Sequence, residues 1–332
     1  MRSSTIPNLS RAAALGIGVL FLAVSSPSHA NPEVWKFEWP ETDFEKTSIS
    51  FGEILSGGPP KDGIPAIDDP AFGTIAEVDE QIADTEPVIT VVIDGQAKAY
   101  PLSILMWHEI VNDELAGIPI SVTYCPLCNS AVVFDRRVGD RVLDFGTTGK
   151  LRHSDLVMYD RQTESWWQQF IGEAIVGEMT GTLLEMLPVR VEPFGRFKER
   201  FPDGQVQLVP ANFRRAYGQN PYAGYDSAPR PFLFAGENPD DIAPLAYVVA
   251  VEAEAWSLEL LKREKRIEKD DLVITWEPGM NSALDSRVIA QGQDVGIVTV
   301  QRQTDNGLVD AVHDVTFAFA FNAFHPGATI HQ

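Results

Sequence analysis

Hydrophobic and polar residues alternate along much of the chain with the two-residue period of β-strands. Residues 88–93 are a β-branched run, Asp94 and Gly95 are typical of a tight turn, and residues 96–100 alternate again. Two such runs joined by Asp-Gly predict a β-hairpin. The pattern therefore favours a chain built mainly from antiparallel strands.

A short helix interrupts this strand pattern. Pro101 is well tolerated at the first position of a helix, and apolar residues follow at helical spacing from Leu102 to Ile110. We expect the helix to end near Asn112 and Asp113. Further strands are predicted over residues 118–124, 131–137 and 141–145.

Two segments of the chain resemble each other. Residues 123–131 align with residues 275–283, with five identities in nine positions, and residues 97–102 align with residues 253–258. Internal similarity of this kind indicates duplication. We therefore expect an α+β fold, mostly antiparallel β with short helices, that is divided into two related, duplicated β-rich domains.

The expected boundaries follow from composition and from this alignment. Proline, glycine and aspartate are frequent before the first hairpin and again between the two aligned segments, as in leaders and connectors. We expect a signal peptide over residues 1–30, an extended leader over 31–86, a first domain over 87–211, a connector over 212–240 and a second, degenerate domain over 241–332.

The first thirty residues have the pattern of an export signal. Arg2 and Arg11 flank a polar start, an apolar run follows over residues 12–24, and small residues precede a cleavage point after Ala30. The apolar run is shorter than the roughly 20 residues of a membrane span, and no second long run follows. We expect a periplasmic or secreted protein without a transmembrane segment once the signal is removed.

Composition excludes several classes of protein. The 332 residues include 47 acidic and 26 basic side chains, which give a formal charge of −21. Such acidity disfavours nucleic acid as a partner, because affinity for phosphate depends on basic patches. Only two cysteines occur, too few for a disulfide scaffold or a four-thiolate cluster.

Both cysteines lie in one short motif, Cys125-Pro126-Leu127-Cys128-Asn129, between two predicted strands. A redox dithiol and a pair of metal ligands both use this spacing. The helix that follows the second cysteine of a thioredoxin-type site is missing here. A turn that ends in a residue tolerating the left-handed conformation, as Asn129 can, is typical of a metal-binding knuckle.

His108 is the nearest plausible imidazole, on the short helix before the knuckle. In the aligned copy, Glu277 and Met280 replace the two cysteines and Glu264 replaces His108, as expected if the three residues share one site. Two thiolates and an imidazole form a soft donor set, which favours copper, with zinc second. Met158 and His325 are additional candidate ligands.

Several motifs together resemble the bacterial family known as domain of unknown function 3179. They are Ala99-Tyr100-Pro101-Leu102, residues 108–113, residues 123–128, Phe134-Asp135-Arg136, residues 156–161 and Phe324-His325-Pro326. The resemblance covers roughly residues 87–330 and implies no settled activity. It marks as signature positions His108, Glu109, Asn112, Asp113, Cys125, Cys128 and, near the end, His325.

Three functions remain open at this point. The first is a metal-binding protein for metal handling or electron transfer, in which Cys125, Cys128 and His108 bind the metal. Glu109 or Asp113 would orient these ligands, and a redox or metal-delivery protein of the periplasm would be the partner. The second is a thiol–disulfide oxidoreductase that uses the same two cysteines. The third is an interaction module with a structural disulfide. Whether the protein is an enzyme stays open.

Overall fold

The computed structural model describes residues 32–332, so the expected signal peptide lies outside the described residues. Strands dominate, as the alternating pattern predicts, and the first predicted hairpin is confirmed. Among the described residues, no helix is long and apolar enough to cross a membrane.

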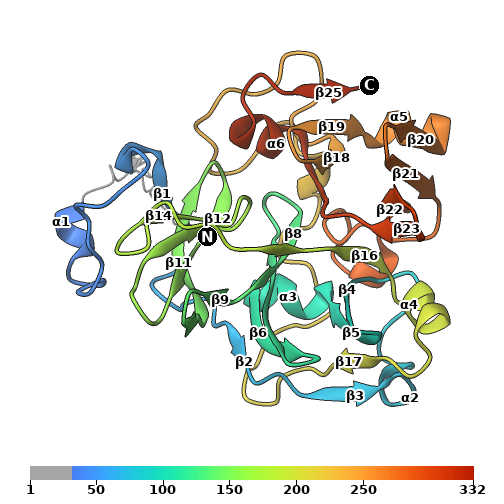
Figure 1. Cartoon of the computed structure of the whole chain (residues 1–332), viewed down its shortest axis with the longest axis horizontal. Helices are drawn as coiled ribbons and strands as arrows, with labels where there is room; N and C mark the ends of the chain where they lie inside the picture. The colour runs from blue at the N-terminus through green and yellow to red at the C-terminus, as the bar shows by residue number, and fades with distance from the viewer. Residues whose placement is uncertain (1–31) are drawn as a thin grey trace, which may run out of the picture.

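Five sheets of four or five strands are arranged around a common centre in the manner of a five-bladed β-propeller (Figure 1). Sheet 1 has the order β1 (Ile54–Ser56), β11 (Phe145–Arg152), β12 (Asp155–Asp160), β13 (Trp166–Gln168), β14 (Glu173–Val176). Sheet 2 has the order β15 (Met186–Leu187), β8 (Ser130–Asp135), β7 (Ile118–Cys125), β6 (Ile110–Leu115), β2 (Ile67–Asp68).

The other three sheets complete the ring. Sheet 3 has the order β16 (Val189–Pro193), β4 (Pro87–Ile93), β5 (Gln96–Pro101), β17 (Gln205–Gln207), β3 (Phe72–Thr74). Sheet 4 has the order β24 (Asp314–Phe317), β18 (Tyr247–Val251), β19 (Glu254–Ser257), β25 (Thr329–His331). Sheet 5 has the order β20 (Arg266–Lys269), β21 (Leu272–Glu277), β22 (Ile297–Thr304), β23 (Gly307–Asp310).

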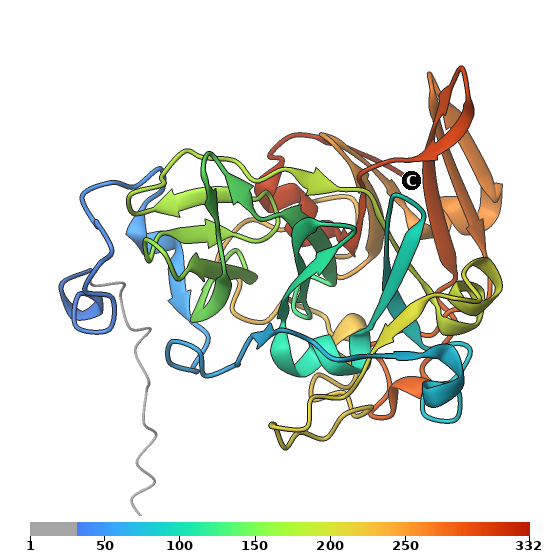
Figure 2. The ribbon, with the colours of Figure 1, turned by 60° about the horizontal axis from the view of Figure 1, so that its bottom comes forward.

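The helices are short, and each one after α1 lies between two strands in the chain (Figure 2). They are α1 (Pro32–Trp35), α2 (Ile75–Val78), α3 (Leu102–His108), α4 (Phe194–Arg200), α5 (Leu258–Glu264) and α6 (Ala318–Phe324). Single 3-10 turns are η1 (Phe51–Glu53), η2 (Tyr225–Ser227) and η3 (Ile289–Gln291), and β9 (Arg137–Val138) pairs with β10 (Arg141–Val142).

The helix after the first hairpin is shorter than its sequence pattern predicts. It ends at His108 instead of near Asn112, because Glu109 adopts a left-handed backbone with φ of 59°. The β-branched residues Ile110 and Val111 then begin β6. Period-3.6 spacing over so few residues does not separate a helix from the strand that follows it.

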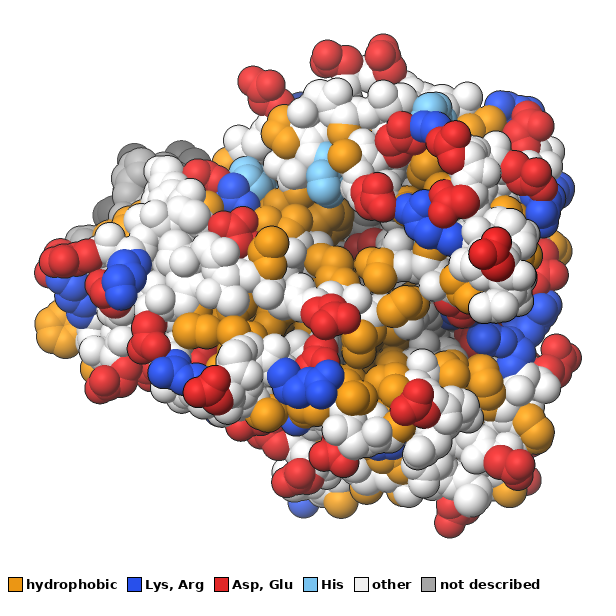
Figure 3. All heavy atoms as spheres, viewed as in Figure 1, with side chains coloured by type: hydrophobic (Ala, Val, Ile, Leu, Met, Phe, Trp, Pro, Cys, Tyr) orange, Lys and Arg blue, Asp and Glu red, His pale blue; other side chains and the backbone are white. Residues whose placement is uncertain are grey.

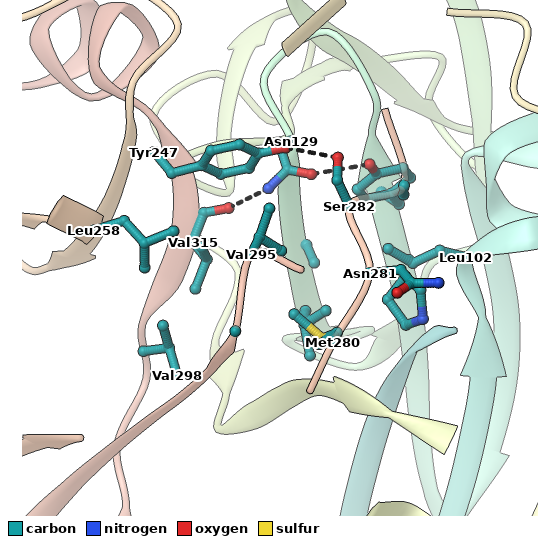
Figure 4. A pocket seen from close by; sticks show the side chains of 16 residues that line it. Leu102, Asn129, Tyr247, Leu258, Met280, Asn281, Ser282, Val295, Val298 and Val315 are labelled. Atoms are coloured by element: carbon teal, nitrogen blue, oxygen red, sulfur yellow. Dashed lines mark hydrogen bonds between the residues drawn. The ribbon is translucent and has the colours of Figure 1, made fainter. Parts of the chain in front are cut away.

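The expectation of two duplicated domains is wrong. One apolar core runs through the centre and contains Ile89 and Val122 from the first half together with Leu284 and Phe319 from the second. Strand β24 from the end of the chain also lies against β8. The two segments that align in sequence face one another across a single cavity, which Asn129 and Asn281 both line (Figure 4).

The segment expected to be an extended leader contributes structure to three sheets. It supplies the edge strands β1, β2 and β3. It also buries Trp39 and Phe44 against Trp166 of β13, with ring centroids 5.4 Å apart in both pairs. These aromatic contacts hold the start of the described chain onto sheet 1.

A buried amide links sheets 1 and 2. Asn112 Nδ2 on β6 donates to Asp68 Oδ1 at 2.8 Å and to the Phe145 carbonyl at 2.8 Å. The Phe145 amide donates back to Asn112 Oδ1 at 3.1 Å. Both backbone groups of Phe145 therefore depend on one side chain.

We predict that Asn112→Leu lowers the free energy of unfolding by about 2–4 kcal/mol, because it leaves buried backbone groups of Phe145 without partners. Urea denaturation measures the loss. Asn322→Ala is the matched control, since Asn322 makes an exposed bond to the Glu237 carbonyl and should change stability by less than about 0.5 kcal/mol. Equal effects of the two substitutions would contradict this role for Asn112.

Candidate functional site

The two cysteines lie at a tight turn between β7 and β8. Cys125 ends β7, and Asn129 precedes β8 with φ of 52°, the left-handed conformation expected for it. The Asn129 Nδ2 donates to the Val315 carbonyl at 2.7 Å, and its Oδ1 accepts from Tyr124 at 3.1 Å (Figure 4). These bonds hold the turn against β24.

Both thiols are free and sealed from solvent. The exposed fractions of Cys125 and Cys128 are 2% and 0%. Burial raises the pKa of Cys125, and it raises the pKa of Cys128 further. Without a cation beside them, both groups therefore remain neutral thiols at ordinary pH.

Asp155, the first residue of β12, completes a three-donor group with the cysteines. One ligand atom from each of the three residues lies within 4.8 Å of the others, and all three side chains are buried. Asp155 Oδ2 accepts from Gln168 Nε2 at 2.6 Å and from the Phe170 amide at 3.0 Å. Within the described chain, its Oδ1 is buried without a hydrogen-bond partner. Burial raises the pKa of Asp155 to about 7.

Glu109 is a second buried acid beside this group. Burial raises its pKa to about 8, and the charge of Asp155 adds to the shift. The Glu109 carbonyl accepts from the Tyr124 amide at 2.8 Å, which fixes the end of α3 beside β7. Glu109 therefore lies near the cysteines and interacts with their surroundings through its charge, but it is not one of the three clustered donors.

Residues with a left-handed backbone conformation occur in each of the three turns that surround the cysteines. Besides Glu109 and Asn129, His153 and Ser154 have φ of 54° and 65° at the tip of the β11–β12 hairpin. None of these residues is glycine, so each conformation costs energy that the surrounding structure must supply. The tip brings the Ser154 carbonyl to 3.8 Å from the Cys125 sulfur.

The segment expected to be a connector, residues 212–240, covers the site. The Tyr225 hydroxyl donates to the Leu127 carbonyl at 3.0 Å and accepts from the Phe232 amide at 3.2 Å. Ser154 Oγ in turn donates to the Phe232 carbonyl at 2.5 Å. A stretch rich in proline and glycine is thus held directly over the turn that carries the cysteines.

His108 does not join the cysteines in the folded chain. It is fully buried, and its Nδ1 lies 2.7 Å from the Pro65 carbonyl while its Nε2 lies 2.8 Å from the Tyr217 hydroxyl. Both ring nitrogens are therefore occupied, and burial lowers the pKa of the ring. This geometry favours Asp155 over His108 as the third donor.

The other residues selected from sequence have different surroundings. Asp113 accepts from Lys98 and from Tyr100, each at 2.7 Å, and Asn112 links two sheets. Met158 is fully buried in the central core, and His325 lines a groove between sheets. Asp113 and His325 lie outside the three-donor group.

Asp155 is the site residue that sequence reasoning missed. Its local signal is an acid directly before Leu156–Tyr159, a run of apolar residues that become fully buried in β12. An aspartate at such a position must itself be buried, and a buried acid requires a partner. The sequence therefore indicates that Asp155 is buried. It does not indicate which side chains surround Asp155, because Cys125 lies thirty residues away in the chain.

The buried acids predict an unusual dependence of stability on pH in the metal-free protein. Glu109 keeps its proton up to about pH 8 when folded but loses it near pH 4.5 when unfolded. The folded state therefore binds more protons in this window, so the free energy of unfolding falls as pH rises. The expected slope is about 1.4 kcal/mol per pH unit for each such group.

Denaturation of the metal-free protein at pH 5 and pH 8 measures this effect. Glu109→Gln should flatten the dependence and be more stable than the wild type at pH 8. Glu259→Gln, at an exposed glutamate paired with Lys262, should leave it unchanged. Stability that rises across the window, unaffected by Glu109→Gln, would contradict the prediction.

Comparison with known proteins places the chain in a family without assigning it a function. No curated protein and no solved structure matches it. The model of one family, described as Protein of unknown function (DUF3179), matches residues 61–328, which is most of the chain. The protein therefore belongs to the DUF3179 family, as its motifs suggested.

Proposed function

We propose that this protein is a metalloprotein in which Cys125, Cys128 and Asp155 bind one transition-metal ion. The observation that carries the proposal is the close approach of three buried donor atoms, all within 4.8 Å of one another. Two thiols and a carboxyl group with an unpartnered buried oxygen are costly to bury together. A divalent cation compensates that cost, because it converts the donors to ligands.

The donor set favours zinc over copper. Sequence reasoning expected an imidazole as the third ligand, which with two thiolates suits copper. The third donor is instead a carboxylate, and zinc accepts sulfur and carboxylate oxygen together in tetrahedral sites. Glu109 is buried beside the group but is not one of the clustered donors, so it would act on Asp155 through its charge.

The closure of the site supports an ion that stays with the folded protein. Residues 212–240 cover the cysteine turn, and β24 binds the Cys128 carbonyl through the Thr316 hydroxyl at 2.7 Å. Metal transfer to another protein requires exchange of ligands at an accessible site. We therefore propose a resident metal centre in place of a cargo site.

Metal analysis by mass spectrometry tests the proposal and the ligand set. Wild-type protein purified from cells supplied with zinc and copper should carry about one equivalent of zinc. The Cys125→Ser, Cys128→Ser double variant should carry less than about a tenth of an equivalent, and Asp155→Asn should lose its metal on dialysis. His108→Gln is the matched control and should retain the metal.

Two results would overturn this assignment. Reduced wild-type protein that neither carries nor binds zinc or copper would exclude a metal centre. Loss of the metal in His108→Gln with retention in Asp155→Asn would restore the ligand set expected from sequence.

Thiol reactivity separates the metal centre from the oxidoreductase hypothesis. A catalytic thiol must be accessible to its substrate and must have a low pKa. Here both cysteines are buried away from solvent, and burial raises the pKa of each thiol. We predict that metal-free, reduced protein reacts with an aromatic disulfide reagent at least about 100-fold faster in denaturant than when folded. Rapid reaction of one thiol in the folded protein would favour the oxidoreductase. Absence of free thiols before reduction would favour the structural disulfide.

A further inference from the structure

A second site lies at the centre of the ring of sheets, on the face shown in Figure 3. It is a groove with a volume of about 570 Å³ between sheets 2, 3, 4 and 5. In Figure 3 the centre of this face is hollowed and lined with hydrophobic side chains. Pockets of this volume with apolar walls commonly bind small molecules.

The walls of the groove are mainly aliphatic. Apolar side chains reach it from β8, β15 and β16 and from the segments before β14 and β24, namely Val132, Ile171, Leu187, Val189 and Val312. Of these, Ile171, Leu187 and Val312 keep part of their surface exposed. A ligand that covers them gains free energy from the apolar area it removes from water.

The charges around the groove disfavour an anionic ligand. Arg302 is the basic residue in the lining, and its guanidinium already pairs with Glu252 and Asp271, each at 2.7 Å. Asp314 adds a partly exposed acid, whose Oδ1 accepts from the Ala131 amide at 3.0 Å. A bound anion would face Asp314 without an uncompensated cation.

His313 gives the groove a hydrogen-bond acceptor. Its Nδ1 lies 2.9 Å from the Ala311 carbonyl, which can only accept, so Nδ1 carries the proton. Burial lowers the pKa of the ring, which keeps it neutral near pH 7. Nε2 is then a bare acceptor, and within the described chain no hydrogen bond involves it. It can therefore accept a hydrogen bond from a ligand.

We propose that this groove binds a neutral, largely apolar molecule that carries a hydroxyl group, of the alcohol or phenol class. The hydroxyl donates to His313 Nε2, and the hydrocarbon body lies against the aliphatic walls. The proposal goes beyond the metal centre and does not depend on it, because no donor of the metal site lines the groove.

Three naphthalene derivatives of similar size test the proposal on the wild-type protein. Calorimetric titration should show that 2-naphthol binds at least about fivefold more tightly than 2-methoxynaphthalene, which lacks the donor, since one hydrogen bond contributes about 1 kcal/mol. 2-Naphthoate should bind more weakly than 2-naphthol. Equal affinities for the naphthol and the methoxy compound, or no binding of either, would overturn the proposal.

Two variants locate the binding in the groove. His313→Phe should abolish the preference for 2-naphthol while retaining affinity for 2-methoxynaphthalene, and Leu187→Gln should weaken both. His331→Phe, at a histidine that stacks on Trp256 outside the groove, should bind like the wild type. Preserved preference in a folded His313→Phe variant would also overturn the proposal. Because the ligand series uses wild-type protein, the test stands even if a variant does not fold.

Discussion

The contact between the cysteine turn and β24 is the interaction on which the rest of this structure depends. The Cys128 carbonyl accepts from the Thr316 hydroxyl at 2.7 Å and from the Phe317 amide at 3.1 Å, and Asn129 donates to Val315. The partners are separated by more than 180 residues in the chain. These bonds join sheet 2 to sheet 4, and they close the inner side of the site. They also place β24 so that Asp314 lines the groove.

The proposed metal site carries an energetic cost in the metal-free protein. Cys125, Cys128, Asp155 and Glu109 are buried together, and burial raises the pKa of each. In the metal-free state Glu109 keeps its proton near neutral pH, and Asp155, with a pKa of about 7, is partly protonated there, which reduces the isolated charge that the site must bury. The left-handed residues at the three turns add backbone strain at the same place. Buried ionisable groups and backbone strain that occur together around one group of side chains are typical of a functional site.

The proposed metal site and the groove are neighbours. Asp314 lines the groove, and its charge adds to the effect of burial, which raises the pKa of both Cys128 and Asp155. Phe170 also lines the groove, and its backbone amide donates to Asp155. A molecule in the groove would therefore lie next to residues that hold the donor group.

The sequence by itself determined the local features of this protein. The β-branched run and the Asp-Gly turn specified the β4–β5 hairpin, and the spacing of the cysteines specified a knuckle in which Asn129 is left-handed. Short sequence motifs also indicated the family. These features depend on residues close together in the chain, whose backbone preferences act locally.

Only the tertiary structure decided the long-range features. In the folded chain Asp155 lies beside the cysteines, and His108 contacts Pro65 and Tyr217 instead. Residues 212–240 cover the site, and both halves of the chain share one core. Periodicity shows which face of a strand is buried but not which strand of another sheet covers it. The ligand set and the single core depend on such pairings, which form because distant apolar surfaces must be buried together.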